Sequence, residues 1–268
     1  MTNKWNYQPP TAEEKEQRDK LAAELELDPV ISLLLVRRGL KTAAEVKKFF
    51  KPSLNDLEDP FLMPDMDKAV KRLNKALGEK EKILIYGDYD VDGTTAVSLV
   101  YKYLRAYTSN LDYYIPDRYD EGYGISTKGI DYAAEQGVTL IISLDCGIKA
   151  IEKIEYAKGK GIDFIICDHH LADDVLPDAV AVLDAKREDS RYPYEHLSGC
   201  GVGFKFMQAF AADNGFPFSE LEKLLELTAV SIASDIVPIT GENRILAYYG
   251  LKQINSNPSL GLKGIIDV

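Results

Sequence analysis

Residues 82–107 read KILIYGDYDVDGTTAVSLVYKYLRAY, and this stretch decides the predicted fold. Its first six residues form an apolar run of strand length, and residues 94–107 place apolar side chains at helical spacing. Between these two segments lie three acids, Asp88, Asp90 and Asp92. Because carboxylates this close together repel one another, we expect a positive charge to offset them.

The same order of strand and helix continues downstream of this stretch. We expect four further strands, at residues 111–116, 139–147, 163–168 and 179–184. Helices are expected at 12–27, 29–50, 66–78, 127–137, 149–161, 201–213, 219–233 and 243–256. Alternation of strands and helices predicts βαβ units and a parallel sheet. The predicted fold class is therefore α/β, a parallel sheet of about five strands flanked by helices, with a helical N-terminal extension and a helical C-terminal part.

The proline-containing segment FFKPSLNDLEDPFLMPDM (49–66) is typical of an ordered connector. We therefore expect residues 1–65 to form the N-terminal extension and connector, and residues 66–268 to form the α/β domain. The chain stops at LGLKGIIDV, soon after a predicted helix, and we expect a further domain to follow.

Composition narrows the class of protein. The net charge of −11 argues against a simple nucleic-acid binder, although a metal would neutralise acids gathered at one site. Cys146, Cys167 and Cys200 lack CxxC spacing, which favours small, buried, reduced thiols over a zinc cluster. No apolar run reaches the roughly 18 residues of a membrane span, and the polar N-terminus lacks a signal-peptide core. We predict a cytoplasmic protein with no membrane partner.

Further acids and two adjacent histidines stand where predicted strands or helices end. These residues are Asp145 in SLDCG, Asp168, His169 and His170 in CDHH, and Asp235 in SIASDIVP. In an open parallel sheet, ligand sites form outside the carboxyl ends of the strands. Several carboxylates with imidazole suit a pair of Mn²⁺ or Mg²⁺ ions, which together promote phosphoryl displacement. The first functional hypothesis is therefore metal-dependent phosphoester hydrolysis.

Each part of this pattern has a simpler interpretation. DxDxDG also opens an EF-hand loop, but the twelfth residue from Asp88 is Leu99 rather than glutamate. Asp145 alone could cap a helix, and the two adjacent histidines alone could be structural. The only other histidine, His196, has no such neighbours and is predicted to be non-catalytic.

Two glycine-containing segments could contact a substrate. In IPDRYDEGYGIS (115–126), Arg118 and Tyr123 could clamp phosphate and stack on a base, with Gly124 permitting a tight backbone. The alternative is an ordinary polar loop. In SGCGVGF (198–204), the glycines around Gly201 indicate either a closely packed helix start or an amide nest for phosphate.

These motifs, taken in order, resemble the DHH phosphoesterase superfamily. The segments GDYDVDGTTA, SLDCGI, CDHH and SIASDIVP carry that resemblance. Within the superfamily, four further segments resemble the RecJ family of single-strand-specific exonucleases: DPFLMPDMDKAV, IPDRYDEGYG, LSGCGVGFKF and PITGENRILAYYGLKQIN.

The resemblance implies a role for each residue. Asp90 and Asp92 would each bind one metal, Asp145 would bridge both, and Asp88 would complete the first metal's shell. His169 and Asp235 would bind the second metal, with Asp168 orienting His169. His170 would face the scissile phosphate, and Tyr86 replaces a histidine that many superfamily members have. The substrate would be bound by Arg118, Tyr123, Gly124, Gly201, Asn243 and Arg244.

The implied activity is 5′-to-3′ removal of nucleotides from single-stranded DNA in repair and recombination, with two Mn²⁺ or Mg²⁺ ions. A single-stranded-DNA-binding protein is an implied partner. The second domain and the OB-fold of the family are not found in these residues. Two alternatives stay open at this point: a phosphoesterase acting on short oligonucleotides or nucleotide phosphates, and an inactive fragment that serves as a binding module.

Overall fold

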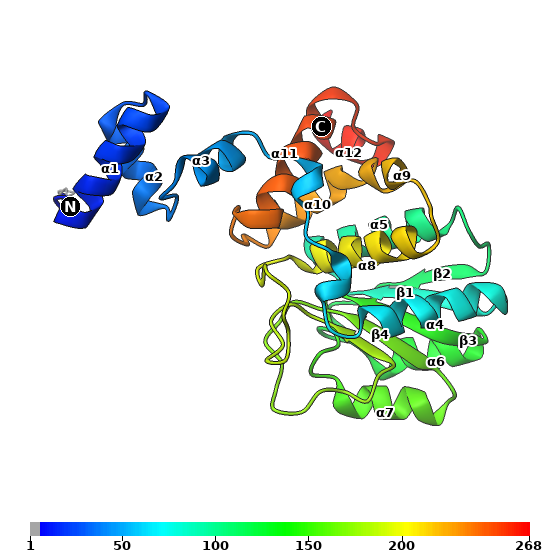
Figure 1. The fold of residues 1–268 in the computed structure, drawn as a ribbon. Helices are drawn as coiled ribbons and strands as arrows, with labels where there is room; N and C mark the ends of the chain where they lie inside the picture. The colour runs from blue at the N-terminus through cyan, green and yellow to red at the C-terminus, as the bar shows by residue number, and fades with distance from the viewer. Residues whose placement is uncertain (1–5) are drawn as a thin grey trace. The chain divides into compact units, whose positions relative to one another are not determined.

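The computed structural model describes residues 6–268, which form two compact units divided between Ser53 and Leu54 (Figure 1). Residues 1–5 of the predicted extension lie outside the described residues. The division falls earlier than the expected boundary after residue 65. The reason is that Pro60 and Met63 of the connector are buried within the second unit.

The first unit consists of α1 (Ala12–Leu25), α2 (Pro29–Arg37) and α3 (Ala43–Phe50) around a small core. That core contains Leu21, Leu35, Val36 and Val46. The single helix predicted over residues 29–50 is wrong. It divides because Gly39 adopts a left-handed φ of 82° and Thr42 starts α3 with a capping box.

The second unit contains one five-stranded sheet of order β2-β1-β3-β4-β5, in which every neighbouring pair is parallel. Its strands are β1 (Lys82–Gly87), β2 (Leu111–Tyr114), β3 (Val138–Leu144), β4 (Asp163–Cys167) and β5 (Ala181–Leu183). The predicted α/β class, with a parallel sheet flanked by helices, is confirmed.

Helices cover both faces of this sheet (Figure 1). The second unit contains η1 (Leu54–Asp56), η2 (Pro60–Leu62), α4 (Met66–Gly78), α5 (Val91–Leu104), α6 (Thr127–Glu135), α7 (Ile151–Gly159), α8 (Gly199–Asp213), α9 (Phe218–Glu222), α10 (Leu225–Ser234), α11 (Gly241–Ser256) and α12 (Leu260–Ile266). Along β1, Ile83 and Ile85 face the core beneath α4, α5 and α8, whereas Leu84 and Tyr86 face the core beneath α6 and α7. Burial on both faces explains why β1 is almost continuously apolar.

Several boundaries near the site differ from prediction, among them the start of α8, which is Gly199 rather than residue 201. The helix expected to begin at residue 94 begins at Val91, and the strand expected to end at 147 ends at Leu144. The helix predicted over 219–233 is two helices, α9 and α10, and Gln253 of α11 donates to the Lys223 carbonyl at the break. The short α12 was not predicted.

No helix within residues 6–268 has the length and apolar character needed to cross a bilayer.

A buried guanidinium links α4 to the end of the sheet at which β1 and β4 begin. Arg72 donates to Glu81 at 2.7 and 3.1 Å and to Asp163 at 2.6 Å. Burial would raise the pKa of Glu81, but the hydrogen bonds from Arg72 and Thr139, together with the charge of Arg72, outweigh burial and lower it.

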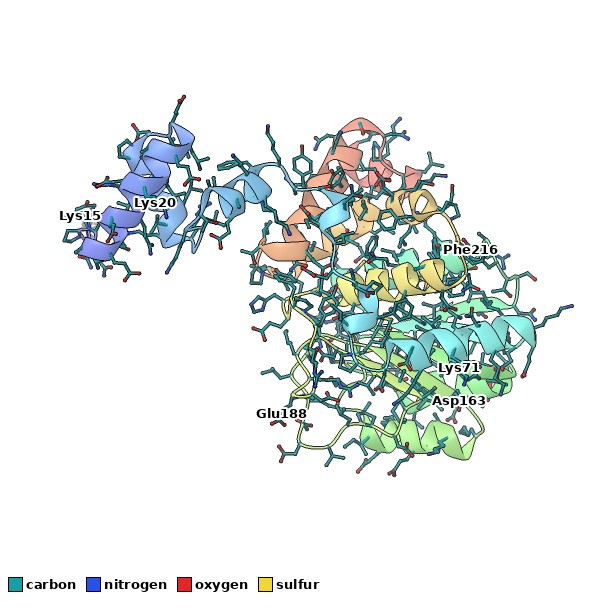
Figure 2. All side chains as sticks on the ribbon, in the orientation of Figure 1. Lys15, Lys20, Lys71, Asp163, Glu188 and Phe216 are labelled. Atoms are coloured by element: carbon teal, nitrogen blue, oxygen red, sulfur yellow. The ribbon has the colours of Figure 1, made fainter. Side chains whose placement is uncertain are left out.

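We predict that Arg72→Met lowers the free energy of unfolding at pH 7 by about 3 kcal/mol, because it leaves the partly buried Glu81 without its cation. The folded pKa of Glu81 is lowered, so its contribution is present above the unfolded pKa of about 4.3 and is lost as pH falls. Urea unfolding at pH 7 and pH 3.5 should therefore show a smaller deficit at the lower pH. Lys71→Met, an exposed change on the same helix (Figure 2), is the control. A deficit that does not change with pH would contradict this account.

Candidate metal centre

The predicted ligands meet at the carboxyl edge of the sheet, where ligand sites form in open α/β folds. Asp88 follows β1, Asp145 follows β3, and Asp168, His169 and His170 follow β4. All except His170 are buried. The parallel sheet therefore gathers residues that are up to 82 positions apart in sequence, from Asp88 to His170.

The DxDxDG segment forms a strand-to-helix turn. Asp90 caps α5, since its Oδ1 accepts a hydrogen bond from Gly93 N at 2.9 Å. Asp90 itself is exposed, and the cap brings Asp92 into the buried first turn of the helix. Because α5 runs unbroken from Val91 to Leu104, the segment is not an EF-hand loop.

His169 stands at the centre of a carboxylate cluster. Its Nε2 lies 3.1 Å from Asp145 Oδ1 and 3.7 Å from both Asp92 Oδ2 and Asp235 Oδ2. One ligand atom from each of Asp92, His169 and Asp235 lies within 4.8 Å of the others, and Asp145 forms a similar group with His169 and His170. The structure thus brings together most of the predicted metal ligands.

Several atoms of this cluster have no hydrogen-bond partner among residues 6–268. These buried atoms are Asp88 Oδ2, Asp145 Oδ1 and both ring nitrogens of His169. Burying such groups without compensation costs roughly 1–3 kcal/mol each. Carboxylate oxygens and an imidazole nitrogen that converge in this way fit Mn²⁺ or Mg²⁺.

Asp92 is held in place from one side by α8 and α10. Its Oδ2 accepts from Gly199 N at 2.7 Å, and its Oδ1 accepts from Cys200 N at 2.8 Å and from Ser231 Oγ at 2.7 Å. Ser231 Oγ also lies 2.6 Å from Ser198 Oγ, the N-cap of α8. The first turn of α8 therefore receives a carboxylate at its positive end, as helix N-termini favour.

Asp145 occupies a constrained and electrostatically unfavourable position. Its φ is 60°, which non-glycine residues rarely adopt. A Cβ on Gly199 would lie 2.6 Å from Asp145 Cβ, so that position requires glycine. Burial, and then the charges of Asp92 and Asp90, raise the pKa of Asp145 to about 10. A nearby cation would offset that effect.

The prediction that Asp168 orients the His169 ring is wrong. Asp168 Oδ1 lies 2.7 Å from His170 Nδ1 and also accepts from His169 N, while Asp168 Oδ2 accepts from Ile148 N at 3.0 Å. Although burial would raise it, the pKa of Asp168 is lowered because His170 bonds to it, and the same bond raises the pKa of His170. Asp168 therefore holds the turn and orients His170.

Arg118, Tyr123 and Gly124 are brought to the site by the loop after β2. Tyr123 Oη lies 3.2 Å from His170 Nε2, and Gly124 N donates to Asp88 Oδ1 at 3.0 Å. The Arg118 guanidinium lies 5.0 Å from the centre of the Tyr89 ring, which contacts Tyr123 edge-on. Gly124 has a φ of 82°, a conformation that glycine adopts without strain.

Tyr86 points away from the ligand cluster into the core beneath α6 and α7. Its hydroxyl donates to Gly124 O and accepts from Ser126 N, both at 3.0 Å. The ring stacks on Tyr114, with centroids 5.4 Å apart. At the position where the resemblance implies a histidine, this chain therefore has a buried tyrosine that anchors the loop carrying Tyr123.

The other predicted substrate residues have different surroundings. Gly201 is buried in the first turn of α8, and its amide donates to Ser198 Oγ at 3.1 Å. Asn243 is buried and donates to the carbonyls of His196 and Pro238. Arg244 follows it in α11 and is half-buried. His196, predicted to be non-catalytic, lies 3.6 Å from Glu195 on the surface.

Sequence reasoning missed three residues near the cluster: Tyr89, Ser231 and Asp184. Ser231 lies one helical turn before Asp235, a spacing that could have identified it. Asp184 follows β5 as the other acids follow their strands. Burial raises the pKa of Asp184 to about 6, and its Oδ1 accepts from Lys186 N at 2.7 Å.

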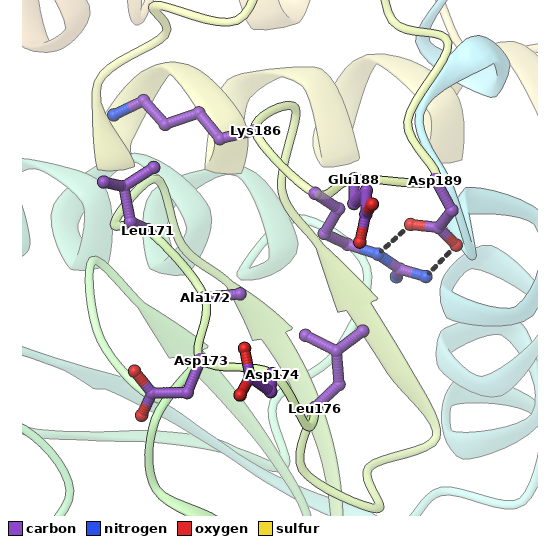
Figure 3. Close-up of a pocket in the computed structure, with 9 residues that line it drawn as sticks. Leu171, Ala172, Asp173, Asp174, Leu176, Lys186, Glu188 and Asp189 are labelled. Atoms are coloured by element: carbon purple, nitrogen blue, oxygen red, sulfur yellow. Dashed lines mark hydrogen bonds and ion pairs between the residues drawn. The ribbon is translucent and has the colours of Figure 1, made fainter.

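A groove of about 500 Å³ lies beside the segment that follows His170 (Figure 3). Its walls are residues 171–174, Leu176 and residues 186–189. Lys186 bonds to the His169 carbonyl, and Arg187 is bonded to Asp189 and to Asp65 of the connector. The bond from Lys186 thus holds the carbonyl of His169 in place.

The chain was compared with known protein families and with curated proteins. Residues 82–232 match the description "DHH family, N-terminal domain". The single-stranded-DNA-specific exonuclease RecJ of Bacillus subtilis is 37% identical over 263 residues, which cover 98% of this chain and 32% of that protein. The protein of the same name from Escherichia coli is 34% identical, over 91% of this chain and 43% of that protein. The chain thus spans less than half the length of these relatives.

Among solved structures, RecJ from Thermus thermophilus in complex with Mn²⁺ superposes with a TM-score of 0.78 at 25% identity. The match covers 94% of this chain and 35% of that chain.

We predict that Ser231→Ala weakens Mn²⁺ binding roughly 10-fold or more, because groups that orient a ligand typically contribute 10–100-fold to affinity. Titration calorimetry measures the change. Thr228→Val, which removes an equally buried hydroxyl of α10 bonded to the Leu225 carbonyl, should bind as wild type does. Equal affinities in all three proteins would contradict a positioning role for Ser231.

Proposed function

This chain belongs to the DHH family, and from that premise we propose that it hydrolyses single-stranded DNA from the 5′ end, with Mn²⁺ or Mg²⁺. The observation that carries the proposal is the contact of His169 with Asp145, Asp92 and Asp235 at 3.1–3.7 Å. Three carboxylates this close to one buried imidazole need a cation. The exonuclease names of the relatives support the choice of substrate.

In this proposal, Asp92, Asp145, His169 and Asp235 hold the metal ions, with Asp88 and Asp90 completing the set. Bound divalent ions supply a nucleophile at neutral pH and stabilise the charge of an in-line phosphoryl displacement. The protein contributes rigidity. The bonds from α8 and Ser231 fix Asp92, and Gly199 allows Asp145 to pack against the start of α8.

We assign His170 to the scissile phosphate. A carboxylate only accepts hydrogen bonds, so His170 Nδ1 carries a proton and donates it to Asp168. The raised pKa of His170 favours a second proton on Nε2, which can donate to a phosphate oxygen. Tyr123 Oη lies 3.2 Å from His170 Nε2, at the position where we expect a substrate oxygen to bind.

Arg118, Tyr123 and Gly124 are proposed to contact the substrate strand. A guanidinium held over the Tyr89 ring suits a phosphate with a stacked base. The roles of Gly201, Asn243 and Arg244 in substrate binding stay predictions. So do the division into residues 1–65 and 66–268, the cytoplasmic location, and a single-stranded-DNA-binding protein as partner.

The proposal is tested by nucleotide release from single-stranded DNA that carries a 5′ label, with Mn²⁺. Asp145→Asn is expected to lower turnover about 1,000-fold or more, which corresponds to about 4 kcal/mol of activation free energy. Asp174→Asn, an exposed change in the loop after His170, is the control and should leave turnover unchanged.

Release from single strands but not from duplex, lost in Asp145→Asn, would support the proposed function. Release from a dinucleotide with none from longer strands would instead favour a phosphoesterase of short oligonucleotides. Normal turnover by Asp145→Asn would overturn the assignment of the centre.

A further inference from the structure

The first compact unit carries a groove of its own, which the proposed catalytic site does not use. The groove has a volume of about 440 Å³ and lies between the end of α1 and one side of α3. It is lined by Leu25, Leu27, Val46, Lys47, Lys48, Phe50 and Lys51. We call it the lysine groove.

The rim of the lysine groove carries one sign of charge. All three of its charged lining residues are lysines. Within residues 6–268, neither Lys47 nor Lys51 has an ion-pair partner. Residues 25–51, which contain the whole lining, carry six lysines and arginines against three acids, whereas the whole chain has a net charge of −11. The groove therefore offers a local positive potential in an otherwise acidic protein, which favours an anionic ligand.

The floor of the lysine groove is apolar and packs against the core of the first unit. Val46 is buried in the core of the unit, and Leu25 and Leu27 pack against that core. Phe50, by contrast, keeps 54% of its surface exposed at the groove. Lys51 is the C-cap of α3, one turn after Lys47, and its amide donates to the Lys47 carbonyl at 2.9 Å. Two cations are thus presented along one edge, with an exposed aromatic side chain between them in sequence.

We propose that the lysine groove binds single-stranded nucleic acid, with Lys47 and Lys51 on the phosphates and a base against Phe50. Sites for single strands combine a positive groove that follows the backbone with aromatic faces that stack bases. This inference rests on the proposed function for its choice of substrate. An acidic peptide would satisfy the same charges, but the exposed aromatic ring and the proposed substrate favour the nucleic acid.

Binding in the lysine groove should affect long strands and short ones differently. A strand bound in the lysine groove is retained near the chain, which raises its effective concentration at any other site on the same molecule. A dinucleotide bound at the catalytic site is too short to gain from this. Loss of the groove should therefore raise KM for long strands and leave kcat, and all constants for a dinucleotide, unchanged.

The direct test is binding of a fluorescent 20-nucleotide single strand to the 268-residue chain in EDTA, followed by fluorescence anisotropy. The test variant is Lys47→Gln/Lys51→Gln. The matched control is Lys15→Gln/Lys20→Gln, which removes two exposed charges from α1 of the same unit (Figure 2). Thermal unfolding verifies that both variants fold as wild type does.

The Lys47/Lys51 variant is expected to bind roughly 10-fold or more weakly at 50 mM salt. Its plot of log affinity against log salt should be shallower by about 1.4, because each phosphate contact on a single strand contributes about 0.7. The Lys15/Lys20 control should lie close to wild type in both. Phe50→Leu, which keeps an apolar side chain but loses the ring, should weaken binding about 5-fold or more.

Equal affinity and equal salt dependence in the two lysine pairs would overturn the proposal. Binding of an acidic, leucine-containing peptide that depends on Lys47 and Lys51, without any such effect on DNA, would overturn it in favour of a protein partner. Because EDTA prevents metal-dependent hydrolysis, the test is separate from the proposed function. An inactive chain with lysine-dependent binding would refute only the catalytic proposal, and an active chain with unchanged binding only this inference.

Discussion

Asp92 receives two backbone amides from the start of α8 and the Ser231 hydroxyl from α10, and the candidate centre depends on these bonds. These bonds offset the burial of the Asp92 carboxylate alone. Asp145, Asp235 and His169 still face one another with fewer hydrogen-bond donors than acceptors. Such a cluster is costly without a cation. The position of α8 is bound up with the same centre, since Gly199 at its start approaches Asp145 closely enough to exclude any side chain.

Much of this arrangement could be predicted from the sequence because parallel sheets place the ends of their strands at one edge. The apolar runs before Asp88, Asp145 and Asp168 were sufficient to put those acids together. The partner of Asp168 could not be predicted, since it depends on how the turn after β4 directs two adjacent histidine rings. The role of Gly199 could not be predicted because it arises from contacts with Asp92 and Asp145, which are distant in sequence. The spacing of Ser231 from Asp235 offered a hint, but the bond from Ser231 to Asp92 depends on how α10 packs against α5.

In the helical parts, too, some features could be predicted from the sequence and others were missed. The run over 29–50 is apolar enough to suggest one helix, but Gly39 and the capping box at Thr42 divide it. These are local signals that hydrophobic spacing alone overlooks. The two units also differ in charge, with a basic segment in the first and an excess of acids in the second. The difference in charge can be read from the sequence. The groove that brings Lys47, Lys48 and Lys51 to one surface cannot, because it depends on how α1 and α3 pack.

The central claim is that the cluster around His169 is a divalent-metal centre. Anomalous diffraction from crystals grown with Mn²⁺, collected at the manganese absorption edge, tests it most directly. The account predicts a strong peak beside His169 Nε2, within coordination distance of Asp145 and of Asp92 or Asp235, and its loss in Asp145→Asn. Crystals that show no manganese at this cluster, or manganese only at surface carboxylates, would contradict the claim.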